Sequence, residues 1–597
     1  MPASSARRNL FVPAAAAALL VLMAVLMYAS SRNDSITTDE LPHVAAGYSY
    51  LVKADYRLNP EHPPLMKDLA AFPLLFMNLR APWDDKSWTQ ETNGQWGFGS
   101  LLIFGNNADA ITQAAKSPMI LFTVALGWVI FWWTRKQFGD SPALLALFFY
   151  AFSPTFLAHG RLVTTDVGAA AGYFIGAIAF LRFLRTPTKW NVALAGLAMA
   201  FAFLAKYSTF GLAPIAILLA VAWPLVHEPL GSRLRGVLRS LQLTICVFGI
   251  ALLAIYPVYL HHTWNFPPEQ QRKYAELGIG VRGELKYAVH WASDKPVLRP
   301  WAEYLFGPIY VVQRSDLDKN SRYFWGQFYN TGVPLYFPFV YLVKEPLPLH
   351  ILTIIVLIFA LARIRRTLWR REWMETHFTE LAFLVVIGAY WAAAIYSNLN
   401  IGVRHILPTF PFVYVLVASG ITVLYRRVQG RPEIGQPNPE HRVEPTPTAA
   451  PRRRTWAIRL ILGALLAWQA ITVLRVHPSY LAYFNELAGG PDGGWRYVVD
   501  SNIDWGQDMK RLAAFVEQRG IPEIHLDFFG SAEPVYYLKE KVWGISSCSE
   551  PLKGWVAVSV MWYQHSREKP ECDYRRWLPM EKLASKIGYS IFVFHIE

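Results

Sequence analysis

The chain has 597 residues, of which 53% are apolar and 17% are charged. That charged fraction is well below the roughly 25% typical of a soluble globular chain. It excludes a disordered chain and a small disulfide-rich protein, and it indicates a polytopic membrane protein. Lysine and arginine outnumber aspartate and glutamate by 57 to 43. Such an excess suggests a nucleic-acid partner only if membrane topology does not account for it.

The apolar residues are grouped in stretches of membrane-spanning length. A transmembrane helix needs roughly 20 mostly apolar residues, and the sequence contains about eleven candidates. They are residues 10–30, 117–134, 142–158, 167–184, 190–205, 208–226, 238–259, 346–362, 379–396, 406–425 and 456–474. The first stretch is longer than the apolar region of a signal peptide, so we predict an uncleaved anchor.

Lysine and arginine gather in alternate connections, which sets the expected orientation. With the N-terminus in the cytoplasm, the basic connections all fall on the cytoplasmic side. They include the Pro-rich segment 426–454, which is typical of a disordered linker. The net charge is then a topological signal and implies no nucleic-acid partner. We expect a multi-pass protein of the cell inner (plasma) membrane with an extracytoplasmic C-terminal domain.

Three long segments, 31–116, 260–345 and 475–597, fall on the outer side. The first two are rich in aromatic residues and proline, and they predict helices along the interface, as in 41–53 and 321–345. The third contains strand-like patterns in RYVVDSN, EIHLDFF, GWVAVSVMW and YSIFVFHI, with an amphipathic helix at 507–519.

The expected fold is therefore a polytopic α-helical membrane protein of about eleven transmembrane helices. It has outer interfacial helices and a small C-terminal soluble α/β domain. We divide the chain into a membrane module 1–425, the cytoplasmic linker 426–454, a last transmembrane helix 455–475 and an extracytoplasmic α/β domain 476–597.

Three cations lie at span ends on the outer face, where the charge bias does not expect them. They are Arg161, Lys206 and Arg404. Each alone is explained by snorkelling, in which the aliphatic stem stays in lipid and the charged head reaches water. Three on one face can also hold an anionic headgroup such as a lipid-linked phosphate, where charge-assisted hydrogen bonds are strong.

Carboxylates occur on the same face. Asp39 and Glu40 follow the first apolar stretch in SITTDELPH, and Asp166 opens a later one in TTDVGAA. Acids at helix starts are common as dipole complements or N-caps, and that interpretation remains open for all three. Glu61 and His62 stand in NPEHPP, where the prolines fix the direction of the chain. The two can ligate a metal, although ligand sets usually have three or four members.

The predicted C-terminal domain holds two further features. Cys548 and Cys572 lie on the expected oxidising side and can pair, but spacing alone does not decide it. Four aspartates, Asp500, Asp504, Asp508 and Asp527, can indicate an acceptor site, but solvated turn and cap residues explain them better.

Together these motifs resemble the GT-C superfamily of polytopic glycosyltransferases. The likeness is closest to the protein O-mannosyltransferase-like branch of phospholipid carrier-dependent enzymes, which includes the bacterial aminoarabinose transferase of lipid A. It is carried by Asp39-Glu40, by Glu61-His62-Pro63-Pro64, by Asp166 in RLVTTD and by the RH-x-L-P motif that begins at Arg404-His405. The aminoarabinose branch has a lysine where His62 stands. A C-terminal stretch, YFNELAGGPDGGWRYVVDSNIDWGQDMKRL, looks like one found in a subset of such enzymes.

The resemblance implies an inverting transfer of a sugar from a polyprenyl-phosphate donor to a lipid, glycan or protein acceptor. Asp39 is then the expected base, with Asp166 orienting a substrate and Glu40 beside it. Arg404, Lys206 and Arg161 are expected at the donor phosphate, with His62 or His405 as helpers. A divalent metal at Glu61 and His62 is left open. The alternative is a transporter or flippase for a lipid-linked sugar, which should place ionisable groups deep in its spans.

Overall fold

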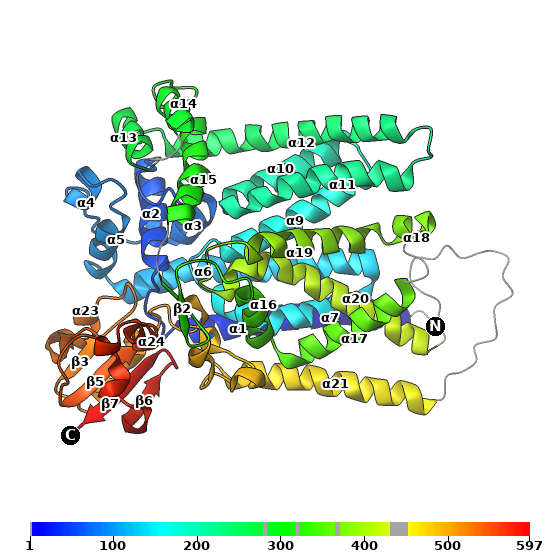
Figure 1. The fold of residues 1–597 in the computed structure, drawn as a ribbon. Coiled ribbons are helices and arrows are strands. Elements are labelled where there is room, and N and C mark those ends of the chain that lie inside the picture. The colour runs from blue at the N-terminus through cyan, green and yellow to red at the C-terminus, as the bar shows by residue number, and fades with distance from the viewer. Residues whose placement is uncertain (1–2, 279–282, 318–320, 365–369, 430–451) are drawn as a thin grey trace.

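The computed structural model describes residues 3–278, 283–317, 321–364, 370–429 and 452–597. Long helices run side by side as a bundle, and the N-terminus lies at one end of it (Figure 1). The opposite end carries shorter helices, a hairpin and a small sheet (Figure 1). Residues 430–451, most of the predicted linker, lie outside the described residues.

Eight helical stretches in the described residues are long and apolar enough to cross a membrane. This protein is therefore a membrane protein. The helices concerned are α1 (Ala3–Ser31), α6 (Ala108–Phe138), α9 (Asp166–Arg185), α11 (Leu212–His227), α12 (Arg233–His262), α19 (Phe378–Ile395), α20 (Phe410–Val428) and α21 (Arg452–Arg475).

The other three predicted spans also coincide with helices. α16 (Tyr336–Lys344) and α17 (Leu347–Ile364) are together long and apolar enough for a span and are bent by 114°, as in a broken span or a re-entrant loop. α7 (Asp140–Ala151) and α10 (Lys189–Ala205) are apolar but shorter than a full span. The predicted span 142–158 was too long, because Ser153 caps a separate helix, α8 (Pro154–His159), that begins with proline.

The end of the bundle away from the N-terminus carries the polar connections. Its helices are α2 (Glu40–Lys53), α3 (Leu65–Ala71), α4 (Lys86–Thr89), α5 (Gln95–Phe104), α13 (Pro268–Gly278), α14 (Gly283–Ser293) and α15 (Arg299–Leu317). The interfacial helix predicted at 41–53 is α2. The prediction for 321–345 was wrong in its first part, because β1 (Arg322–Phe324) and β2 (Gln327–Tyr329) form an antiparallel hairpin before α16. Short α18 (Arg371–Thr376) lies at the other end (Figure 1).

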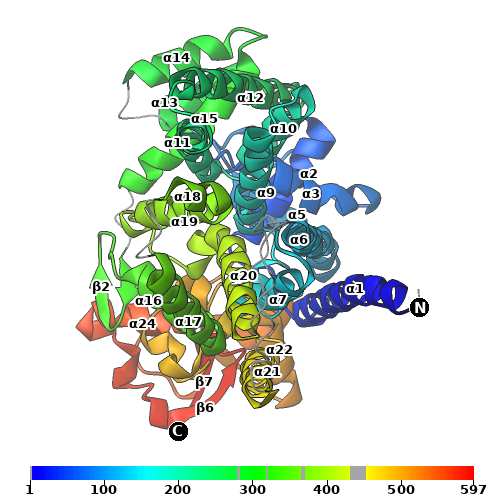
Figure 2. The ribbon, with the colours of Figure 1, turned by 90° about the vertical axis from the view of Figure 1, so that its right-hand side faces the viewer.

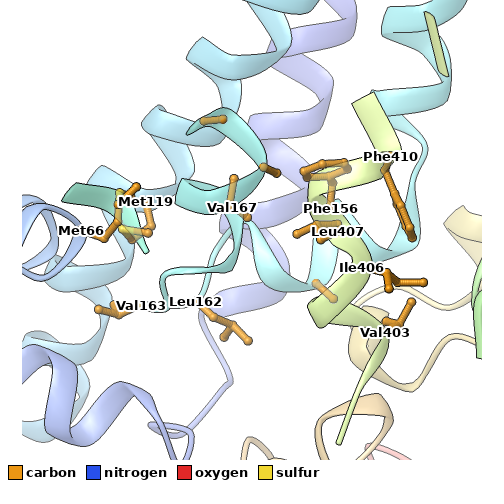
Figure 3. Close-up of a cluster of buried hydrophobic side chains, with 14 of the residues drawn as sticks. Met66, Met119, Phe156, Leu162, Val163, Val167, Val403, Ile406, Leu407 and Phe410 are labelled. Atoms are coloured by element: carbon orange, nitrogen blue, oxygen red, sulfur yellow. The ribbon is translucent and has the colours of Figure 1, made fainter. Parts of the chain in front are cut away.

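A buried apolar cluster supports the polar end of the bundle (Figure 3). It joins α3, α6, α8 and α9 to the short helical turn η3 (Val403–Thr409) that leads into α20. Its members are Met66, Met119, Phe156, Leu162, Val163, Val167, Val403, Ile406, Leu407 and Phe410. In the end-on view, α9 lies among α6, α10 and α20 (Figure 2), and it is buried along most of its length. The starts of α9 and α20 are therefore rigidly placed.

The C-terminal domain is a five-stranded mixed sheet with helices, in the strand order β4-β3-β5-β7-β6. β3 pairs in parallel with β4 and β5, while β7 pairs antiparallel with β5 and β6. Its elements are α22 (Met509–Gln518), β3 (Ile524–Asp527), α23 (Pro534–Leu538), β4 (Val542–Gly544), β5 (Gly554–Ser559), α24 (Val560–His565), β6 (Leu583–Ile587) and β7 (Ile591–Ile596). The predicted helix and three of the four predicted strands are confirmed. The strand expected in RYVVDSN is instead a pair of helical turns, with Val498 bridged to Phe324 of the hairpin.

Candidate functional site

A cavity of about 770 Å³ is lined by the polar end of the bundle and by the C-terminal domain. Its wall contains residues from segments that are far apart in the sequence. Six of the residues predicted above as catalytic, phosphate-binding or metal-binding line it: Asp39, Glu61, His62, Lys206, Arg404 and His405.

Four charged side chains form one continuous chain of contacts at this cavity. Arg404 Nη1 lies 3.0 Å from Asp39 Oδ2 and 3.4 Å from Asp166 Oδ2. Lys206 Nζ lies 2.5 Å from the other carboxylate oxygen of Asp166. The Asp39 side chain is 30% exposed, whereas that of Asp166 is 1% exposed. Asp39 is thus the acid that a substrate in the cavity can reach, and Asp166 lies behind the two cations.

The local structure explains why these four side chains converge. Asp39 immediately precedes α2 and Asp166 is the first residue of α9, so both carboxylates meet the positive end of a helix dipole. Neither acts as a side-chain N-cap, because Asp39 makes no cap hydrogen bond and residue 165 holds the cap position of α9. Lys206 and Arg404 do not snorkel, since both end in ion pairs inside the protein.

Three histidines face the same region. The rings of His43 and His62 lie edge to face, 5.2 Å apart. Burial lowers the pKa of the His43 imidazole to about 4 and holds the pKa of His62 well below its usual value. Both rings are therefore neutral at pH 7. His62 Nδ1 and His405 Nε2 are buried and have no hydrogen-bond partner among the described residues. Both histidines line the cavity.

Lys67 fixes the loop that carries His62, and the sequence analysis did not single it out. Its Nζ donates to Tyr50 Oη at 2.9 Å and to the carbonyl oxygens of Asn59 and His62, each at 2.8 Å. The side chain is fully buried, and burial lowers the pKa of the Lys67 ammonium to about 7. The signal that could have found it is its position on α3, directly after the two prolines.

Three predicted site residues do not line the cavity: Asp166, which lies behind Lys206 and Arg404, and Glu40 and Arg161, which pair with other charges inside the protein. Glu40 accepts hydrogen bonds from the Thr37 and Val163 amides and pairs with Lys116 Nζ at 3.4 Å. Arg161 pairs with Asp34, and both side chains are almost completely buried. Their charges are balanced inside the protein, so these contacts hold the loop before Asp39 in place.

Among the described residues, no third His, Cys, Asp or Glu side chain joins Glu61 and His62 in a metal-binding arrangement. Glu61 Oε1 already accepts from Asn93 Nδ2 at 3.2 Å, Gln95 Nε2 at 3.0 Å and Arg314 Nη1 at 3.2 Å. No group of three or more His, Cys, Asp or Glu side chains with a metal-binding arrangement occurs in the part of the chain that the structure describes.

A segment of the C-terminal domain reaches the site, which the sequence analysis missed. Asp500 lines the cavity, and burial raises the pKa of its carboxyl. Asp504 and Asp508 are buried, so our interpretation of these aspartates as solvated turn residues was wrong. Elsewhere in the domain, Cys548 and Cys572 form a disulfide.

One family model matches the chain, over residues 98–261, and its description is dolichyl-phosphate-mannose-protein mannosyltransferase. That part of the chain is thus similar to a family of membrane glycosyltransferases. The matched residues include Asp166, Lys206 and the helices that carry them.

Solved structures of low sequence identity also match. One is the archaeal oligosaccharyltransferase AglB from Archaeoglobus fulgidus in complex with an inhibitory peptide and a dolichol-phosphate, at 12% identity and a TM-score of 0.46. That match covers 94% of this chain and 71% of AglB. Another is ArnT from Cupriavidus metallidurans bound to undecaprenyl phosphate, at 12% identity and a TM-score of 0.43, covering 97% of each chain. No curated protein sequence matches.

The site holds groups that a glycosyl transfer needs. It has a reachable carboxylate, two cations that share a second carboxylate, and two unpartnered imidazole nitrogens around one cavity. A carboxylate can accept a proton from an attacking hydroxyl, and cations can stabilise the charge on a leaving phosphate.

Proposed function

We propose that this protein is an inverting glycosyltransferase that moves a sugar from a polyprenyl-phosphate donor to an acceptor on the extracytoplasmic face of the membrane. The acceptor is a lipid, a glycan or a protein. The observation that carries the proposal is the convergence of Asp39, Asp166, Lys206 and Arg404 at one cavity from four separate segments.

Asp39 is the base in this proposal. Its carboxylate takes the proton of the acceptor hydroxyl while the acceptor oxygen attacks the anomeric carbon. The bond between that carbon and the phosphate oxygen breaks in the same step, so the configuration at the carbon inverts. Asp39 suits this role because its side chain lines the cavity, is 30% exposed and is held in place by Arg404.

Arg404 and Lys206 stabilise the departing phosphate. The leaving group gains negative charge as the sugar bond breaks, and cations already in place favour that transition state over the ground state. His62 and His405 also line the cavity and can add N–H donors to the phosphate. Asp166 keeps Lys206 and Arg404 together, which would otherwise repel each other.

The membrane orientation belongs to the same proposal. The basic connections at the N-terminal end of the bundle support a cytoplasmic N-terminus. The cavity and the C-terminal domain lie at the opposite end, which supports an extracytoplasmic site (Figure 1). Tyr207, Tyr390 and Leu399 line the cavity wall near the spans and offer an apolar surface for the first prenyl units.

The test is the Asp39→Asn variant in membranes loaded with labelled undecaprenyl-phosphate-linked sugar. We expect release of undecaprenyl phosphate to fall by at least roughly 100-fold, the usual scale for loss of a general base, with normal expression. Asp492→Asn is the matched control, because Asp492 is exposed and pairs with Lys586 on the domain surface. Release at the wild-type rate by Asp39→Asn excludes the assigned base. Movement of intact lipid-linked sugar across the membrane without bond cleavage would instead identify a transporter.

A further inference from the structure

Several parts of the C-terminal domain line the cavity, among them Phe529, Met561 and His565. One short segment, residues 500–507, also lies against Arg404, and we call it the docking segment. It is tied to the Arg404 turn by three hydrogen bonds. Ser501 Oγ accepts from Arg404 Nε at 3.1 Å and donates to the Ile401 carbonyl at 2.6 Å, while Asn502 Oδ1 accepts from the Val403 amide at 3.0 Å.

The aromatic side chain of the docking segment covers the Arg404 guanidinium. The guanidinium carbon lies 4.2 Å from the centre of the Trp505 ring, and the tryptophan is only 2% exposed. A cation held over an indole face in a dry environment is attracted by the ring quadrupole. Ser501 and Trp505 thus fix both the direction and the plane of the guanidinium, and Nη1 is left to face Asp39 and Asp166.

The same segment also holds the loop that carries Asp39. The Thr38 amide donates to the Trp505 carbonyl at 3.0 Å, and the Ser35 amide donates to the Gln507 carbonyl at 2.9 Å. Gly402 allows the close contact, because a Cβ there would lie 2.2 Å from Ser501 Oγ. One segment of the soluble domain therefore sets the relative position of Asp39 and Arg404.

We propose that Ser501 and Trp505 are positioning residues that orient Arg404 toward the phosphate of a lipid-linked ligand, so that the C-terminal domain forms part of the active site. This inference rests on the proposed function, because it takes Arg404 as the phosphate ligand. A purely structural domain would need neither the buried stacking on Arg404 nor the hydrogen bond to its Nε.

The experiment measures binding of undecaprenyl phosphate, with undecaprenol as the uncharged comparison, to the full chain in nanodiscs. We expect Trp505→Leu to weaken undecaprenyl phosphate binding by roughly 30-fold, the scale of a lost buried cation–π contact, and to leave undecaprenol binding unchanged. Trp505→Phe should restore most of the affinity, because phenylalanine keeps an aromatic face. Ser501→Ala should weaken binding by roughly tenfold through loss of one hydrogen bond to a charged group.

The control for a general loss of folding is Trp495→Leu. Trp495 is a buried tryptophan of the same domain that packs on Tyr563 and Phe592, away from Arg404. We expect it to lower the thermal midpoint without changing the phosphate affinity. In an Arg404→Gln background, Trp505→Leu should have no further effect, because its partner is gone.

The outcomes separate the two claims. If Arg404→Gln binds undecaprenyl phosphate as the wild type does, the phosphate assignment in the proposed function is wrong. If Arg404→Gln weakens binding but both Trp505→Leu and Ser501→Ala do not, the positioning inference is wrong. Additive effects of Trp505→Leu and Arg404→Gln also overturn it. Should Trp505→Leu fail to fold, Ser501→Ala and Trp505→Phe carry the same test.

Discussion

Replacing Asp166 with asparagine should destabilise the protein far more than the same change at Asp39. Asp166 is 1% exposed and pairs with Lys206, whose side chain is 13% exposed. Removing one member of a buried pair leaves an uncompensated charge and costs about 3–5 kcal/mol. We expect about 3 kcal/mol, the lower end, because Arg404 retains Asp39 as a partner and only Lys206 loses its counter-ion.

The Asp39→Asn variant provides the contrast. Its side chain is 30% exposed, so the loss of its pair with Arg404 should cost only about 0–1 kcal/mol. The two variants remove the same chemical group within one chain of contacts. They differ in burial, and burial decides how strongly the unpaired cation that remains destabilises the folded protein.

The assay is unfolding of the purified protein in mixed micelles titrated with SDS, followed by tryptophan fluorescence. A double variant, Asp166→Asn with Lys206→Met, should recover about 2 kcal/mol relative to Asp166→Asn alone, since no buried cation is then left unpaired. The reasoning is refuted if Asp166→Asn unfolds at the wild-type SDS concentration, or if removal of Lys206 adds to the loss.

Two further predictions concern pH and backbone geometry. His43 is neutral when folded because burial lowers its pKa to about 4 from 6.5, so the unfolded state binds the proton first as the pH falls. Protonation of His43 in the unfolded state should lower the free energy of unfolding by roughly 3 kcal/mol between pH 6.5 and 4. Thermal scans of the His43→Asn variant should lack this part of the loss. The control variant His595→Asn, at an exposed histidine, should retain it. Gly506 has φ +83°, and a Cβ there would lie 2.6 Å from the Gly530 Cα. Gly506→Ala should therefore lower the stability of the C-terminal domain by more than about 1 kcal/mol, and protection from limited proteolysis equal to the wild type would contradict this.

The membrane part of the fold was predictable because long apolar stretches carry a strong, local signal. Each of the eleven predicted stretches contains a helix, and eight of the helical stretches among the described residues are long enough to span a membrane. The errors lie where a turn signal interrupts an apolar run. Ser153 and Pro154 divide the stretch 142–158, and the hairpin at Arg322–Tyr329 replaces part of a predicted interfacial helix.

The candidate site was predictable where charged residues stand at the ends of apolar stretches on the predicted outer face. Asp39, Asp166, Lys206 and Arg404 were all singled out and lie together. Arg161 carries the same sequence signal but is paired with Asp34 away from the cavity. The position of a charged residue in the sequence does not show whether it contacts a substrate or pairs with another buried charge.

The docking segment was missed for a physical reason. Its aspartates stand beside glycine, serine and asparagine, a composition that is typical of solvated turns. The burial of the segment accompanies contacts with residues about 100 and 470 positions away in the chain, namely those of Ser501 with Ile401 and of Gly506 with Ser35. No local pattern reports such a contact.

The contact between Arg511 and Asp34 limits which substitutions the helical bundle and the C-terminal domain can accept independently. Arg511 on α22 pairs with Asp34, which also faces Arg161 and Lys116 of the bundle. A C-terminal domain grafted from another protein without this cation would leave Asp34 with Arg161 and Lys116 alone, and the ion pair that joins the domain to the bundle would be lost. The two halves are thus expected to be inherited as a matched pair, and chimaeras should work only when both partners of this contact come from the same parent.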